Sequence, residues 1–134
     1  MNVFKRAWAS IESTVSPRHF YRLSGLWLPW FAWPAAILLS VGLIWGLAIA
    51  PEDYQQGNSY RIIFIHVPAA SLAMGGYLLL AICAVISLVW RVKTADAVAR
   101  AAAPVGALFC LLALITGSLW GKPTWGTYWV WDAR

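Results

Sequence analysis

His66 is the residue whose side chain offers the widest chemistry in this sequence. It stands in the segment Arg61-Ile-Ile-Phe-Ile-His66-Val-Pro68, and the run that follows Arg61, residues 62–90, has no charged side chains. An ionisable group in a membrane segment is a functional candidate by default. An imidazole there can ligate a metal, carry a proton, or be a polar group satisfied at the membrane interface, and the residue type leaves all three open.

A second feature is the density of aromatic rings near the end of the sequence. Five aromatic residues fall within twelve positions, and helix breakers separate them. Indole rings offer flat, polarisable faces, so this density predicts a shelf for a large planar apolar molecule. A dense interfacial anchor is the alternative. The aromatic residues are Trp120, Trp125, Tyr128, Trp129 and Trp131, and the breakers are Gly121, Pro123 and Gly126.

Charged residues flank the predicted shelf. Arg61, Lys122 and Arg134 could pair with carboxylates of a bound molecule, and Asp132 could orient Arg134 or an indole N–H. Haem fits this set, because its iron takes an axial imidazole, its porphyrin stacks and its propionates pair with cations. A quinone would use the shelf without an axial base, so the residues alone do not separate the two ligands.

The composition places these groups on membrane-spanning helices. The 134 residues are 61% hydrophobic and 11% charged, with a mean hydropathy of +0.67, whereas soluble domains run at roughly 45–50% apolar and about 25% charged. These values exclude a disordered chain, a nucleic-acid module, a collagen-like rod and a disulfide-stapled secreted domain. Cys83 and Cys110 lie in apolar runs, and we expect them to be buried as small apolar residues.

Three charge-free stretches reach the ~20 residues that a helix needs to cross a bilayer. We therefore expect an all-α fold, a polytopic membrane helix bundle with three transmembrane helices in this chain. Gly75 and Gly76 in the second span offer a surface for close approach of another helix. The predicted division is an N-terminal arm with a surface amphipathic piece (1–25), spans at about 26–50, 62–90 and 101–120, and a Trp-rich segment (121–134).

Lysine and arginine are divided unevenly between the two ends of these spans. The N-terminal arm and the second loop hold seven, whereas the first loop and the tail hold three. The positive-inside rule therefore predicts a cytoplasmic N-terminus, with loop 51–61 and the Trp-rich segment together on the opposite face. Counting back from Trp90 places His66 about 7 Å beyond the hydrocarbon edge on that same face.

The aromatic tail and the segment around His66 resemble a known family. The tail is similar to the tryptophan-rich WWD signature of haem-handling proteins. Within that group, the segment from Asp53 to Ala70 closely resembles the heme exporter protein C family, also called cytochrome c maturation protein C. The resemblance covers about Ser16 to Arg134. The positions that match the signature are Trp120, Gly121, Trp125, Gly126, Trp129, Trp131, Asp132 and Arg134.

The resemblance implies a bacterial inner-membrane protein of six spans that binds haem b transiently and non-covalently at its periplasmic face. It implies that His66 is an axial ligand of the iron and that the matching WWD residues bind the cofactor. The implied partners are haem, the periplasmic haem chaperone (cytochrome c maturation protein E), the ABC transporter subunits A and B with the small protein D, and the lipid bilayer, with no nucleic acid.

The family chain continues past the signature through three further spans and a second histidine-bearing loop, whereas this sequence ends at Arg134. We therefore expect a truncated chain whose haem retention is weakened or absent. His19 does not replace the second ligand, because the charge count puts it on the cytoplasmic side.

The expected function is haem binding and delivery for c-type cytochrome maturation, by a subunit that is not an enzyme. Two alternatives stay open. A haem lyase would form the thioether bond itself, and it would need a site for a C-x-x-C-H segment that no feature here identifies. A purely structural subunit of the ABC complex would use His66 and the indoles only as an interfacial anchor, and Gly75 and Gly76 fit it equally well.

Overall fold

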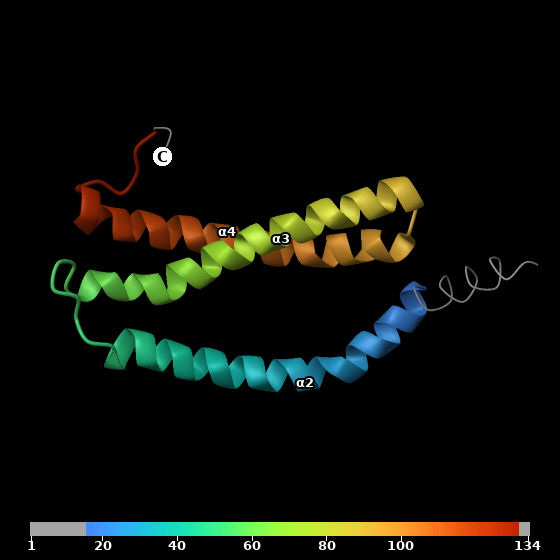
Figure 1. The fold of residues 1–134 in the computed structure, drawn as a ribbon, viewed down its shortest axis with the longest axis horizontal. Coiled ribbons are helices and arrows are strands. Elements are labelled where there is room, and N and C mark those ends of the chain that lie inside the picture. The colour runs from blue at the N-terminus through green and yellow to red at the C-terminus, as the bar shows by residue number, and fades with distance from the viewer. Residues whose placement is uncertain (1–15, 132–134) are drawn as a thin grey trace, which may run out of the picture.

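Helices account for most of the chain in the computed structural model, which describes residues 16–131 (Figure 1). The fold class is all-α, as predicted, and an isolated bridge between Asp53 and Gly57 is the β pairing found within residues 16–131. The elements in order are α2 (Pro17–Ile44), the π-helix η1 (Trp45–Ile49), the 3-10 helix η2 (Asn58–Ile62), α3 (Ile63–Trp90) and α4 (Lys93–Trp125).

Three segments are long and apolar enough to cross a bilayer: Arg18–Ile49, Asn58–Trp90 and Lys93–Trp125. Large apolar side chains point outward along all three helices, as Leu38 and Leu78 illustrate. Such a surface suits hydrocarbon rather than water, while the helices satisfy their backbone polar groups internally. The chain is therefore a membrane helix bundle.

The first span is one continuous helix from its cap onward. Ser16 caps it by accepting a hydrogen bond from the backbone N–H of His19 at 3.4 Å, and Pro17 occupies the first turn, where its missing N–H costs nothing. The surface amphipathic piece expected within the N-terminal arm is not separate, because residues 17–25 form the first turns of this helix. Pro29 and Pro34 interrupt the backbone ladder near the middle of α2, which bends in its N-terminal half (Figure 1).

Helices α3 and α4 form an antiparallel pair that crosses at a glycine contact. A Cβ atom added to Gly76 would lie 3.4 Å from the Cα of Gly106, whereas one added to Gly75 would meet open space. The close approach predicted from these glycines is thus made within the chain. Cys83 is buried as expected, but Cys110 is exposed. An apolar side chain on a membrane helix need not be covered by protein, because the hydrocarbon of the bilayer is itself apolar.

Helix α4 extends beyond the predicted span 101–120 at both ends. Its last turns run through Gly121 and Pro123, which were expected to break the helix, and it ends where Gly126 adopts a φ of 80°. Polar groups satisfy the carbonyls of this end. The Thr124 hydroxyl donates to the Trp120 carbonyl at 2.9 Å, and the Gly126 N–H donates to the Lys122 carbonyl at 3.0 Å.

Candidate functional site

A cavity of about 390 Å³ lies at the end of the bundle where α3 begins and α4 ends. The chain reverses direction after α4 (Figure 1), and residues 127–131 form part of the cavity wall. Aromatic and aliphatic side chains dominate the lining, and among residues 16–131 His66 and Tyr128 are its titratable groups. The aromatic members are Trp120, Trp125, Tyr128, Trp129 and Trp131.

His66 lies on the first turn of α3, half-buried between α3 and α4. Its Nδ1 is 3.0 Å from the Thr116 hydroxyl, and its ring meets Trp120 edge-on, with centroids 5.8 Å apart and an interplanar angle of 65°. The sequence count placed the imidazole beyond the hydrocarbon edge, above the bundle. Instead the ring lies in the α3–α4 interface, because Thr116 offers it a polar partner there.

Trp120 is anchored by the loop that joins the first two spans. Its indole N–H donates to the Gln56 side-chain oxygen at 2.8 Å. The Asp53 carboxylate in turn accepts the backbone N–H groups of Gln55 and Gln56 at 2.9 and 2.8 Å. This turn fixes the position of Gln56 and ties loop 51–57 to the cavity wall.

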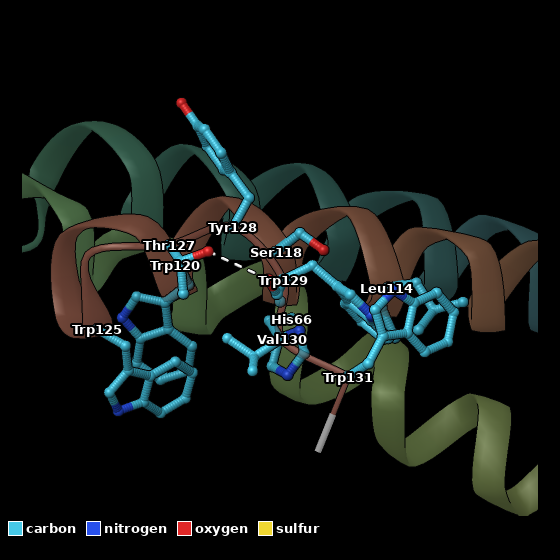
Figure 2. Close-up of a pocket in the computed structure, with 12 residues that line it drawn as sticks. His66, Leu114, Ser118, Trp120, Trp125, Thr127, Tyr128, Trp129, Val130 and Trp131 are labelled. Carbon is cyan, nitrogen blue, oxygen red and sulfur yellow. Dashed lines mark hydrogen bonds between the residues drawn. The ribbon is translucent and has the colours of Figure 1, made fainter.

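The remaining indoles lie around His66, with Trp125 at the end of α4 and Trp129 and Trp131 on the tail that follows. Figure 2 shows Trp125 on one side of His66 and Trp131 on the other. The rings of Trp129 and Trp131 meet edge-on at 5.6 Å with an interplanar angle of 76°. The Thr127 hydroxyl donates to the Trp129 carbonyl at 3.1 Å, which holds the tail in this path (Figure 2).

Two glycines of the predicted site shape this wall without lining the cavity. A Cβ atom on Gly121 would lie 3.3 Å from the Trp125 ring and 3.3 Å from the Thr127 carbonyl oxygen, so Gly121 lets the tail pack close to α4. The positive φ of Gly126 reverses the chain direction after the helix, a conformation that glycine adopts without strain.

Of the predicted cations, Arg61 and Lys122 do not line the cavity. The Arg61 guanidinium donates to the carbonyls of Leu47 and Ala50 at 2.9 and 2.8 Å, at the end of the first span. The Lys122 ammonium donates to the Gly126 carbonyl at 3.1 Å and lies 5.2 Å from the centre of the Tyr128 ring. Lys122 is thus separated from the cavity by one side chain. Asp132 and Arg134 lie outside the described residues.

Sequence reasoning missed three residues that hold His66 and Trp120 in place. These are Thr116, Gly117 and Gln56. Gln56 lies in the segment that resembles the family, but nothing in that segment indicates a partner on α4, and Thr116 and Gly117 belong to no recognisable motif. One signal was present: after Thr94, the next hydroxyl of α4 is Thr116, at the end of a long apolar stretch.

The site can supply one coordination bond within an aromatic environment. Within the described part of the chain, no group of three or more His, Cys, Asp and Glu side chains converges on a point that could hold a bare metal ion. A single imidazole suffices for a metal that a planar macrocycle already chelates, since such a metal needs only axial ligands. Indole rings suit the macrocycle itself.

Comparison with known proteins agrees with this chemistry. The sequence profile of the family described as CcmC, heme exporter protein C, matches residues 10–134. The chain belongs to the heme exporter protein C family. It is 52% identical over 127 residues to heme exporter protein C of Escherichia coli K12, which covers 95% of this chain and 52% of that relative.

Two further family members show the same pattern. Heme exporter protein C of Bradyrhizobium diazoefficiens is 53% identical over 119 residues, covering 89% of this chain and 45% of the relative. That of Rhodobacter capsulatus is 39% identical over 125 residues, covering 93% and 52%. The chain therefore spans about half the length of the curated family members it matches.

Proposed function

We propose that the cavity binds haem b and presents it at the outer face of the bacterial inner membrane. One observation carries the proposal: a single imidazole and four indoles line the same cavity. His66 supplies an axial bond to the iron, and Trp125, Trp129 and Trp131 contact the porphyrin. The relatives' name, heme exporter, favours haem over a quinone, which would leave the imidazole without a role.

The carboxylates of haem need cations at the cavity rim. Lys122 fits this role, because its ammonium lies over Tyr128, which lines the cavity. The Gly126 carbonyl occupies only one of its three N–H donors, which leaves donors for a propionate. Arg134 and Asp132 are proposed to complete the rim. Arg61 is less suited, because its guanidinium is engaged at the first span.

Haem in this site is cargo, held without a covalent bond. Neither cysteine lines the cavity, so a thioether link to this chain has no partner there. The cavity is not enclosed, and Trp131 is 92% exposed, which suits release to another protein. We infer a binding and delivery subunit rather than a haem lyase, working for c-type cytochrome maturation.

The proposed partners follow from the family membership. They are the periplasmic chaperone that receives the haem, cytochrome c maturation protein E, and the ABC transporter subunits A and B with the small protein D. A cytoplasmic N-terminus puts the cavity on the periplasmic side. The basic residues of the described chain support this orientation, because five of them gather at the opposite end: Arg18, Arg22, Arg91, Lys93 and Arg100.

Titration of haem into the detergent-solubilised protein tests this function. We expect a saturable shift of the Soret absorption band in the wild type. His66→Ala should lose the spectral signature of imidazole ligation and bind more weakly, because only the indole contacts remain. His19→Ala is the matched control, since His19 is exposed at the start of α2, away from the cavity. A His66→Ala variant with the wild-type spectrum and affinity would contradict the proposal.

A further inference from the structure

The hydroxyl of Thr116 has only one proton, and it donates this proton in hydrogen bonds to backbone carbonyls. Thr116 Oγ1 lies 2.7 Å from the carbonyl oxygen of Leu112 and 3.3 Å from that of Ala113. Carbonyl oxygens only accept hydrogen bonds, so the hydroxyl must donate toward them. Thr116 is 8% exposed, which leaves little room for water to change this arrangement.

The third neighbour of this hydroxyl is the imidazole of His66. Thr116 Oγ1 is 3.0 Å from His66 Nδ1. Because its proton is committed, the oxygen can only accept here, and Nδ1 must carry a proton. A neutral imidazole with its proton on Nδ1 has a free lone pair on Nε2. This Nε2 has no hydrogen-bond partner among residues 16–131.

The next residues of α4 fix the orientation of the same ring. A Cβ atom on Gly117 would lie 2.9 Å from His66 Cε1, so any larger residue at this position would clash with the imidazole. Trp120 contacts the ring edge-on one turn later. Thr116, Gly117 and Trp120 therefore hold the imidazole from one face of α4.

We propose that Thr116 is a positioning residue that keeps the His66 proton on Nδ1 and thereby presents Nε2 to the haem iron. The inference rests on the proposed function, since it needs an iron at this site. Partners of this kind fix the tautomer of metal-ligating histidines and raise the basicity of the ligating nitrogen. Thr116 touches neither iron nor porphyrin in this role.

The first test reads the tautomer in haem-free protein. In ¹⁵N-histidine-labelled protein carrying His19→Gln, His66 is the one remaining histidine. We expect nitrogen NMR shifts of an Nδ1–H tautomer in this background. Thr116→Val, which keeps the shape but lacks the hydroxyl, should give a mixture of tautomers, and Thr116→Ser should restore the Nδ1–H form. An Nε2–H tautomer in the protein with Thr116 intact overturns the proposal without any variant.

The second test measures haem affinity in the same variants. Thr116→Val should weaken haem binding by roughly 10–100-fold, the usual effect of losing such a partner, and Thr116→Ser should bind like the wild type. Thr124→Val is the matched control. Its hydroxyl also donates to the carbonyl four residues back, at 2.9 Å, but it does not line the cavity.

The outcomes separate this inference from the proposed function. If Thr116→Val changes the tautomer but leaves haem affinity unchanged, Thr116 is structural and the inference is overturned. If His66→Ala also binds haem like the wild type, the proposed function fails instead, whatever the tautomer. A Thr116→Val variant that keeps the Nδ1–H tautomer likewise overturns the inference, because another group then holds the proton.

Discussion

Arg61 has a structural role at the residue scale. Its guanidinium joins the carbonyls of Leu47 and Ala50, which close the first span, while its Nε is buried without a partner among residues 16–131. The backbone carbonyls at the end of a helix have no partner inside the helix and need outside donors. Arg61 supplies two of them from the start of the second span.

Replacing Arg61 with methionine should therefore lower stability. Arg61→Met keeps the length of the side chain but removes both donors, at an expected cost of about 1–3 kcal/mol. Chemical denaturation in detergent micelles measures this loss of stability, and Arg22→Met, at an exposed position on α2, is the control. Unchanged stability with weakened haem binding would contradict the structural role and point to direct contact with a propionate.

Residue types alone revealed His66 and the indoles, but not the groups that position them. The partners of His66 and Trp120 are Thr116 and Gln56, which lie 50 and 64 positions away in sequence. Such contacts depend on how far α3 is shifted along α4. Hydropathy predicts that both helices exist, but it does not set that register.

At the scale of the elements, the α3–α4 crossing sets the register of the site. Gly76 follows His66 by ten residues, and Gly106 precedes Thr116 by ten residues. In an antiparallel pair, the glycine contact and the His66–Thr116 contact therefore share one register, about 15 Å apart along the helices. The close approach at the glycines thus helps to align the imidazole with its hydroxyl.

A large side chain at this crossing should disturb both stability and the site. Gly76→Leu should cost about 1–3 kcal/mol by overpacking, and it should weaken haem binding because the helices must separate. Gly75→Leu is the matched control, since its side chain enters open space. Unfolding and haem titration of the two variants measure the difference. Equal behaviour of both would show that the crossing does not fix the register.

At the end of α4 the helix continues through residues whose types favour a break. Gly121 and Pro123 favour a break, yet the helix continues to Trp125. The Thr124 hydroxyl, the Gly126 N–H and the Lys122 ammonium bind carbonyls at this end, so the helix needs no earlier stop. Consequently Trp120 and Trp125 extend from a helix rather than a loop, and only the later indoles lie on irregular chain.

At the scale of the whole molecule, the chain separates a basic end from an aromatic end. The start of α2 and the α3–α4 turn lie together at one end, while loop 51–57 and the tail lie at the other (Figure 1). The sequence predicted that loop and tail share a face, because two antiparallel crossings return the chain to the same side. The proposed assignment of the aromatic end to the periplasmic face rests on the positive-inside rule.

Thiol labelling tests this orientation. In a background of Cys83→Ala and Cys110→Ala, Gln55→Cys and Thr127→Cys should react with a membrane-impermeant reagent in intact spheroplasts. Lys93→Cys should react only after the membrane is permeabilised. Gln55 and Thr127 belong to the aromatic end, and Lys93 begins α4 at the basic end. Labelling of Lys93→Cys in intact spheroplasts would invert the proposed topology.

The most direct test of the haem-binding account is pulsed EPR of the ferric haem complex, in a protein sample whose histidines alone carry ¹⁵N. We predict a ¹⁵N hyperfine coupling between His66 and the iron that persists in His19→Ala and disappears in His66→Ala. A complex whose iron shows no ¹⁵N coupling, or keeps the full coupling in His66→Ala, would contradict the account.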